Sequence, residues 1–290
     1  MSTSCSVLAE RLGEDLAATA PKARRFLLLE QPGPWSGRNA VTHSDLDVGL
    51  AREILAAADE AGVKVHLIRR SARRAALDTR VCFIADTRRN RPWIERHVLH
   101  DPAEVLRLDL SVRDPVAPWE EPVYAVCTHG KRDPCCARRG RPLARALKAA
   151  RPEQTWEIGH IGGHRFAATF LAFPHGLAFG RVPAAAGPRI VAGLEAGEID
   201  LDHLRGRAGE PPPVQAAEVF VRRELRLGRL DDLTVLDAEG PRVTLRGPTG
   251  RIRVGILRDE RAPRSISCGA EPEPVTAYAL GDFTLLDEAA

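Results

Sequence analysis

The sequence predicts an α/β fold followed by a small antiparallel β-rich region. Over the first two thirds of the chain, apolar runs of strand length such as 26–29 alternate with stretches that favour helices. After about residue 212, short alternating runs are separated by turns containing Gly or Pro, which is typical of an antiparallel sheet. Hydrophobic residues make up 44% of the 290 residues, enough to bury a sizeable core. We therefore expect one large or two to three small folded units.

The first unit, an N-terminal α/β unit, is expected at residues 1–116. A helix and a polar segment come first, and an apolar strand then ends at Pro32 and Gly33. Ser44 and Asp45 can cap a helix that Gly62 ends. The remaining elements are strands at 63–70, 79–87 and 93–100 and a short helix opened by Asp101 and Pro102.

The second unit is expected at residues 117–206, after a Pro-rich stretch at 114–122. Its elements are a strand at 123–127, a helix from about 137 to 150, an extended segment at 155–160, a hairpin around 174–176 and a helix at 184–198. Both units share the order strand, helix, strand, two strands, helix, and we hypothesise an internal duplication of a thioredoxin-like unit. A shared strand order is required by this hypothesis. Residues 205–213 are expected to form a linker, and residues 207–290 a helix with an antiparallel β region.

Composition and charge exclude several classes of protein. Net charge is +3, from 42 basic and 39 acidic residues, which is too balanced to indicate a nucleic-acid binder. The Arg-rich runs at 69–74 and 88–91 lack interleaved aromatic residues and are expected to be solvated loops. No apolar stretch approaches the roughly 20 residues that span a bilayer, and the first residues do not form a secretory signal. We expect a cytoplasmic protein with no membrane partner.

Two loops at strand ends carry the residues suited to chemistry. Cys127 ends the strand at 123–127, and Cys136 follows after eight intervening residues, with Cys135 adjacent to it. His160 and His164 lie in the sequence GHIGGHRF, whose glycines favour a tight loop over a helix. Thiolate plus imidazole suits zinc or iron–sulfur. The other cysteines, Cys5, Cys82 and Cys268, stand alone in the sequence.

Three alternatives remain open on the residues alone. The histidines and thiols can be ordinary core residues. The chain can be a thiol oxidoreductase using Cys127, Cys135 and Cys136, although no C-x-x-C motif occurs. It can also be an interaction module with a structural zinc site. The P-loop, dinucleotide-binding and serine-hydrolase motifs do not occur in the sequence.

Two segments resemble the sucrase/ferredoxin-like family, a group of thioredoxin-like ferredoxins that includes a yeast actin-patch-associated member. They are VCTHGKRDPCCARRGRPLARAL at 126–147 and WEIGHIGGHRFAATFLAFPHGLAFGRV at 156–182, and LLLEQPGPW at 27–35 is also similar. The resemblance implies a thioredoxin-like domain that binds a [2Fe-2S] cluster through Cys127, Cys136, His160 and His164. It assigns Cys136 rather than Cys135 as the second thiolate.

The implied function is one-electron transfer or redox sensing with an unidentified redox partner protein, rather than activity as a stand-alone enzyme. By analogy with Rieske centres, histidine ligation implies a raised reduction potential and coupling of electron and proton transfer. Basic residues of the first loop can stabilise a reduced cluster, dock an acidic partner or simply form a solvated surface. They are His129, Lys131, Arg132, Arg138 and Arg139. We see no carboxylate pair typical of glycosidases.

Overall fold

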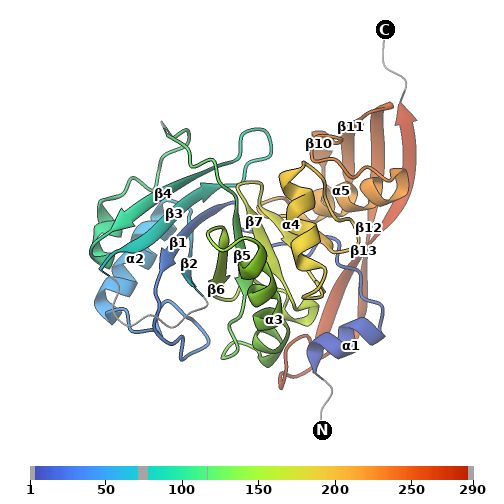
Figure 1. The fold of residues 1–290 in the computed structure, drawn as a ribbon. Helices are drawn as coiled ribbons and strands as arrows, with labels where there is room; N and C mark the ends of the chain where they lie inside the picture. The colour runs from blue at the N-terminus through green and yellow to red at the C-terminus, as the bar shows by residue number, and fades with distance from the viewer. Residues whose placement is uncertain (1–3, 71–77, 116, 287–290) are drawn as a thin grey trace.

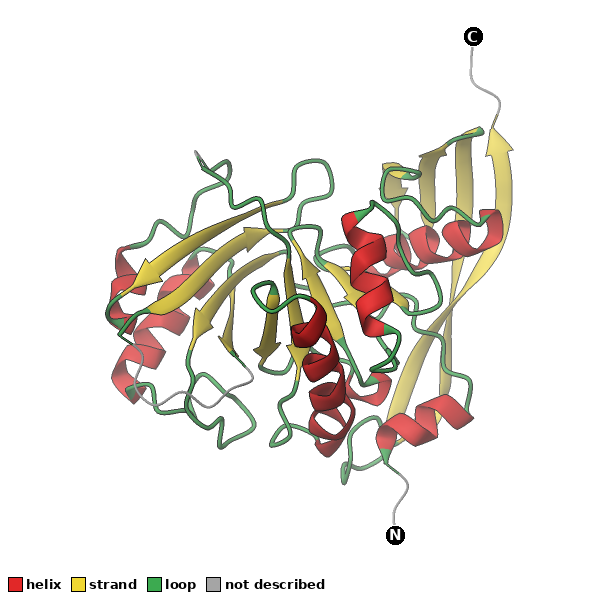
Figure 2. Cartoon of the chain, viewed as in Figure 1, coloured by secondary structure: helices red, strands yellow, loops and turns green. Residues whose placement is uncertain are grey.

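The computed structural model of the protein describes residues 4–70, 78–115 and 117–286 and has the expected α/β architecture (Figure 1). A curled sheet of nine strands forms the main body, and a separate antiparallel sheet of four strands lies toward the C-terminus (Figure 2). The elements before residue 116 are α1 (Cys5–Arg11), β1 (Arg25–Glu30), α2 (Val48–Glu60), β2 (Lys64–Arg69), β3 (Arg80–Asp86), β4 (Trp93–Leu99) and the 3₁₀ helix η1 (Pro102–Arg107).

The following elements complete the large sheet and form the small one. The large sheet is completed by β5 (Val123–Cys127), α3 (Pro134–Ala150), β6 (Thr155–Ile158), the 3₁₀ helix η2 (His164–Phe166), β7 (Phe170–Phe173), β8 (Leu177–Phe179), α4 (Gly187–Glu195) and β9 (Leu204–Arg207). The C-terminal region contains α5 (Pro212–Leu225), β10 (Thr234–Glu239), β11 (Arg242–Gly247), β12 (Gly250–Arg264) and β13 (Glu273–Leu286).

The two halves of the large sheet have the same strand order. The whole sheet runs β4-β3-β1-β2-β6-β5-β7-β8-β9. In the first half β1 is parallel to β2 and antiparallel to β3, which is antiparallel to β4. In the second half β5 has the same relations to β6, β7 and β8. The shared order meets the requirement of the duplication hypothesis, and β2 and β6 pair antiparallel where the halves join.

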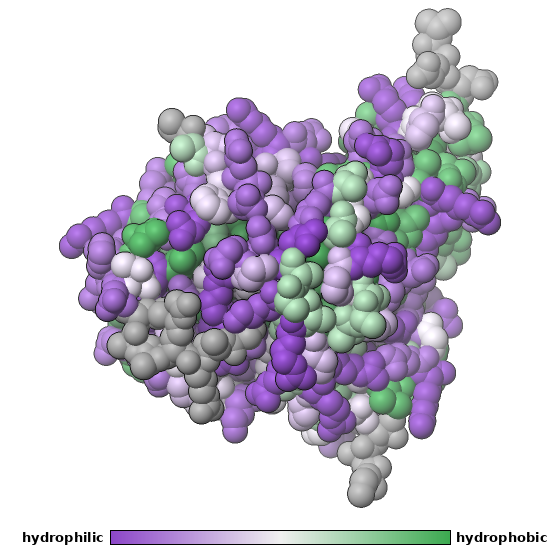
Figure 3. Space-filling model, in the orientation of Figure 1, coloured by the Kyte–Doolittle hydropathy of each residue, from purple (hydrophilic) through white to green (hydrophobic). Residues whose placement is uncertain are grey.

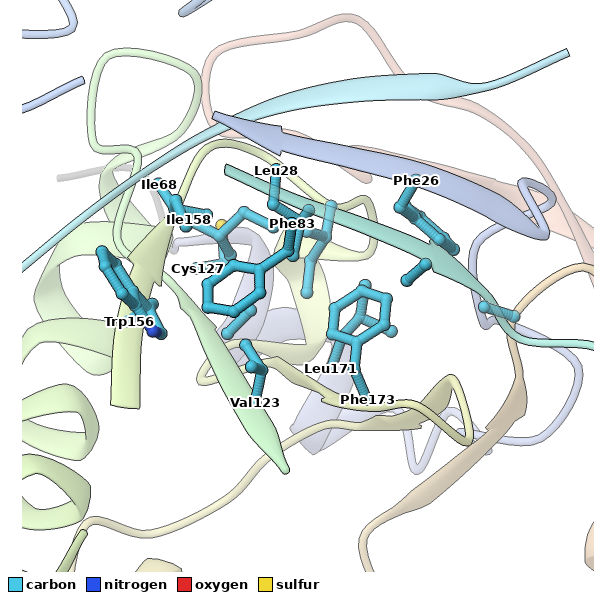
Figure 4. Close-up of a cluster of buried hydrophobic side chains, with 14 of the residues drawn as sticks. Phe26, Leu28, Ile68, Phe83, Val123, Cys127, Trp156, Ile158, Leu171 and Phe173 are labelled. Carbon is cyan, nitrogen blue, oxygen red and sulfur yellow. The ribbon is translucent and has the colours of Figure 1, made fainter. Parts of the chain in front are cut away.

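Alternate side chains of β1 enter different cores, as the two-residue period of a strand dictates. Leu27 and Leu29 pack with α2 on the outer face of the first half. Phe26 and Leu28 enter a core shared with the second half, where they meet residues such as Phe173 (Figure 4). The curl of the sheet therefore encloses an apolar core between the halves, and Cys127 lies within it.

Helix α3 lies on the outer face of the second half and begins beside the C-terminal end of β5. Asp133 is its N-cap, and its carboxylate accepts a hydrogen bond of 2.9 Å from the backbone NH of Cys135. This cap starts the helix at Pro134, three residues earlier than expected. The contact with β5 is close at Gly140, because a Cβ there would overlap the carbonyl oxygen of Cys127.

The prediction that residues 205–213 form a linker is wrong. Residues 204–207 form the buried strand β9, which pairs with β8 and extends the sheet, and α5 begins at Pro212. The two arginines of β9 are buried because each donates a hydrogen bond to a group inside the protein. Arg205 donates to the hydroxyl of Thr19, and Arg207 donates to the backbone carbonyl of His175. His175, in the turn between β7 and β8, is half-buried.

The C-terminal sheet is antiparallel, as expected, with the order β10-β11-β12-β13. Helix α5 packs on one face through residues such as Val221. Figure 3 shows a mainly hydrophilic surface with apolar residues gathered over this region, where Leu257 and Leu285 are exposed. The turn that connects the long strands β12 and β13 lies beside α1 and the start of α3 (Figure 1). Cys268, in this turn, contacts Cys5 in α1.

None of the helices within the described ranges has the length and apolar character needed to cross a membrane. Of the Arg-rich run at 69–74, only Arg69 and Arg70 belong to the described residues. Arg69 pairs with Glu157, and Arg70 lies over the ring of Trp156. These two arginines are therefore engaged with the second half of the sheet instead of forming a solvated loop.

Candidate metal centre

The two cysteines Cys127 and Cys136 face each other at the edge of the shared core. Cys127 ends β5, and Cys136 lies in the first turn of α3, and both are buried. Hydrogen bonds from the Cys136 thiol and from His160 hold the pKa of Cys127 well below its usual range. The same contact raises the pKa of Cys136. The contact therefore favours the thiolate form of Cys127, and a metal ion would displace the proton of Cys136.

The two histidines come from the loop between β6 and β7. His160 is half-buried, and its Nδ1 lies 3.8 Å from the Sγ of Cys136. His164 is buried, and its Nδ1 lies 3.4 Å from the Nε2 of His160. Gly162 and Gly163 have φ values of 86° and 71°, which favour glycine and turn the loop so that both rings reach the same place. Burial lowers the pKa of His164 to about 4, so this imidazole is neutral, as a ligand must be.

The structure brings all four predicted ligand residues to one place, in an elongated arrangement. Donor atoms of Cys127, Cys136 and His160 lie within 4.8 Å of one another. His164 lies beyond this group, next to His160. The cysteines therefore occupy one end of the site and His164 the other.

The family model described as sucrase/ferredoxin-like matches residues 16–206, about two thirds of the chain. The chain belongs to the sucrase/ferredoxin-like family. No curated protein and no solved structure matches the chain. The region that matches the family contains the four predicted ligand residues of this sucrase/ferredoxin-like protein, and it excludes Cys5 and Cys268.

The basic residues beside the site differ in their surroundings. Lys131 and Arg138 are exposed. Arg139 pairs with Glu10, and His129 is buried with its Nε2 2.9 Å from the carbonyl of Gly37. Arg132 is half-buried, so Lys131 and Arg138 are the two fully exposed members of this basic set and are positioned to meet a partner.

A buried cation supports the histidine loop, and the sequence did not indicate it. Arg205 is 1% exposed, and it donates to the hydroxyl of Thr19 and to the carbonyl of Gly162. Burial lowers its pKa to about 9, while the nearby Cys127 and Cys136 oppose this shift. The guanidinium therefore remains charged at neutral pH and lies within the electrostatic range of Cys127 and Cys136. Two arginines within a Gly- and Pro-rich stretch gave no signal of such a role.

His160 lines a pocket of about 180 Å³ between the halves of the molecule. Polar residues that also line it include Lys64, His66 and His129. The pocket is open to solvent, so a ring nitrogen of His160 has a route for proton exchange. The sucrase/ferredoxin-like site is thus closed on the cysteine side and open on the histidine side.

Cys135 points away from this site and joins a second group of donors. Cys5, Asp133, Cys135 and Cys268 have donor atoms within 4.8 Å of one another. Cys5 and Cys268, which stand alone in the sequence, therefore meet Cys135 in the structure, because the terminal segments fold back onto the start of α3. Separations of 130 and 133 residues from Cys135 left no local spacing that could reveal the group. Cys135 faces these residues rather than Cys127, which weakens the thiol-oxidoreductase alternative.

Proposed function

We propose that the protein binds one [2Fe-2S] cluster through Cys127, Cys136, His160 and His164 and acts in one-electron transfer. The observation that carries the proposal is the convergence of Cys127, Cys136 and His160 within 4.8 Å, with His164 beside them. Two cysteines and two histidines form the donor set of a Rieske-type centre. The family to which the chain belongs supports the same assignment.

The elongated arrangement of the donors favours a cluster over a single ion. A tetrahedral zinc ion bonded at about 2.0 to 2.3 Å holds all its donors within roughly 4 Å of one another. A two-iron cluster divides its four donors into two pairs, one on each iron. The cysteines at one end and His164 at the other fit such a division. The Nε2 of His164 is also buried without a hydrogen-bond partner within the described part of the chain.

When bound, such a cluster supplies reversible one-electron chemistry. The chain determines the charge around it. Two neutral imidazoles in place of thiolates make the centre less negative, which favours potentials of about −150 to +300 mV over about −400 mV. The pocket at His160 lets a ring nitrogen exchange a proton with water, so electron and proton transfer are coupled. Exposed Lys131 and Arg138 complement an acidic redox partner.

The first test is the visible spectrum of the anaerobically purified full chain, with iron and acid-labile sulfide measured on the same sample. We expect visible charge-transfer bands and two irons and two sulfides per chain. His164→Cys should retain the cluster, with a lower midpoint potential, because a thiolate adds negative charge. His175→Cys is the matched control and should leave the potential unchanged. A colourless chain that cannot be loaded with iron and sulfide would refute the proposal.

The second test is the pH dependence of the midpoint potential. The potential should fall with rising pH above the pKa of the histidine nitrogen in the oxidised protein, because reduction favours protonation. His164→Cys should weaken this dependence. A potential that stays flat over a wide pH range contradicts solvent-accessible histidine ligands.

A further inference from the structure

We infer that Cys5, Cys135, Cys268 and Asp133 form a second metal site, which binds a single zinc ion through three thiolates and one carboxylate. The three sulfur atoms form a nearly equilateral triangle. The distances are 3.6 Å from Cys5 to Cys135, 3.5 Å from Cys135 to Cys268, and 3.6 Å from Cys268 to Cys5. Both carboxylate oxygens of Asp133 lie 3.7 Å from the Sγ of Cys5.

These distances match the edges of a tetrahedron around one zinc ion. Zinc–sulfur bonds of about 2.3 Å place two sulfurs about 3.8 Å apart, and a zinc–oxygen bond of about 2.0 Å places sulfur and oxygen about 3.5 Å apart. A disulfide requires a sulfur–sulfur distance of about 2.05 Å and joins only two of the three thiols. A cluster of several irons would spread the donors over different metal atoms. The compact, equal-sided group therefore favours one ion.

Asp133 is held in the orientation that a ligand needs. One oxygen accepts the backbone NH of Cys135 at 2.9 Å, and the other accepts the backbone NH of Cys268 at 2.8 Å. The hydroxyl of Ser267 lies 3.3 Å from the second oxygen. A carboxylate has about four positions for accepted bonds, so capacity remains toward the thiols. Hydrogen bonds that fix a ligating carboxylate are typical of metal sites.

The burial of the group also favours a metal ion. Cys5, Cys135 and Asp133 are each at most 2% exposed, and Cys268 is half-buried. Burial of a carboxylate is costly, and a nearby cation offsets this cost beyond what its hydrogen bonds supply. The contact that comes nearest to a cation is made by the imidazole of His164, whose Nε2 lies 3.8 Å from the carboxylate of Asp133. A divalent cation among the four donors would supply the missing charge, and thiolate ligands select zinc among the divalent ions commonly bound by proteins.

The site would join three distant segments of the chain. Cys5 lies in α1, Cys135 in the first turn of α3, and Cys268 in the turn between β12 and β13. The first and last of these lie outside the region that matches the family. A zinc ion would therefore hold the terminal segments against the segment that joins Cys127 to Cys136. This role does not depend on the cluster proposed above.

The test is zinc analysis and zinc X-ray absorption spectroscopy on the anaerobically purified full chain after loading with zinc chloride. We expect one zinc per chain with three sulfur neighbours at about 2.3 Å and one oxygen neighbour at about 2.0 Å. Cys5→Ser and Cys268→Ser should each weaken zinc binding at least tenfold in chelator competition, since even loss of an outer-shell partner costs about 10- to 100-fold. Cys82→Ser replaces a buried cysteine outside both groups and should retain zinc.

Three results would overturn the inference. The first is a reduced chain that binds no zinc. The second is zinc with two sulfur and two imidazole neighbours, which would place the ion at Cys127, Cys136 and the histidines instead. The third is a disulfide between any two of Cys5, Cys135 and Cys268 in the anaerobic protein, detected by alkylation and mass spectrometry. Iron content and the visible spectrum report separately on the [2Fe-2S] proposal, so the failure of either assignment is distinguishable from that of the other.

Discussion

Replacing Gly140 by Ala should destabilise the protein, although the same change in a solvent-facing helix is stabilising. A Cβ at position 140 overlaps the carbonyl oxygen of Cys127 and lies 3.1 Å from its carbonyl carbon. Ordinary contact begins at 3.4 Å, and the opposing atoms are backbone atoms of a buried strand that cannot rotate away. The helix must therefore retreat from β5, which also draws Cys136 away from Cys127.

Two opposing effects determine the magnitude for Gly140→Ala. Alanine gains about 1 kcal/mol over glycine in a helix interior. Overpacking a close-packed core costs about 1 to 3 kcal/mol, and occasionally more, and here the strain falls on backbone atoms. With the overpacking cost at its upper end of about 3 kcal/mol and a gain of about 1 kcal/mol, we expect the free energy of unfolding to fall by about 2 kcal/mol. Urea denaturation followed by circular dichroism measures this change. Iron bound per chain should fall as well.

Gly193 in α4 provides the matched control. A Cβ there meets the backbone oxygen of Glu198 at 3.6 Å, which is ordinary contact. Gly193→Ala should therefore raise the free energy of unfolding by up to about 1 kcal/mol and leave the iron content unchanged. If Gly140→Ala is as stable as the parent and binds iron normally, the helix does not rest on β5 as described, and the positioning of Cys136 is wrong.

Three further perturbations test other parts of the structure. Glu218→Gln should lower the free energy of unfolding by about 3 to 5 kcal/mol in urea, because buried Arg222 and Arg207 then lose their carboxylate; an unchanged midpoint contradicts this. Arg205→Met should lower the midpoint potential by removing a buried positive charge beside the cysteine pair, whereas Arg207→Met, whose charge faces Glu218, should not. Burial lowers the pKa of His175 to about 4, so the folded protein favours the neutral imidazole. The contribution of His175 to the stability of the protein is therefore complete above pH 6.5 and is lost as the pH falls toward 4. His175→Asn should flatten the pH dependence of the free energy of unfolding in this window, by about 1 to 3 kcal/mol, as measured by urea denaturation. An identical pH profile would show that His175 is already solvated.

Local patterns were sufficient to predict most of the large sheet. Strand periodicity, the Pro32–Gly33 turn and the caps at Asp101 and Gly62 depend on neighbours in sequence, and these elements occur in the structure. Strand β9 was missed for the opposite reason. Its arginines are buried only because Thr19 and the carbonyl of His175, distant in sequence, accept their hydrogen bonds. No local pattern reveals that a charged residue has such a partner.

The same distinction applies to the candidate sites. The cysteine and histidine pairs each lie within one short loop at a strand end, and the order of strands β5 and β6 in the sheet brings the two loops together. The two segments that resemble the family contain all four of these residues, so the sequence is sufficient to indicate them. The group around Cys135 needed the full fold, because two of its thiols come from opposite ends of the chain.

Adjacent cysteines at the start of a helix can serve two sites at once. Successive residues of an α-helix point about 100° apart, so Cys135 and Cys136 cannot face the same ligand. Cys136 faces Cys127 and His160, while Cys135 faces Cys5 and Cys268. Asp133 caps this helix, holds the turn at Cys268 and lies 3.8 Å from the Nε2 of His164. A zinc ion at the group around Cys135 would therefore fix the helix start that carries Cys136. The loss of the terminal segments should then loosen the proposed cluster site, even though the family match does not include those segments.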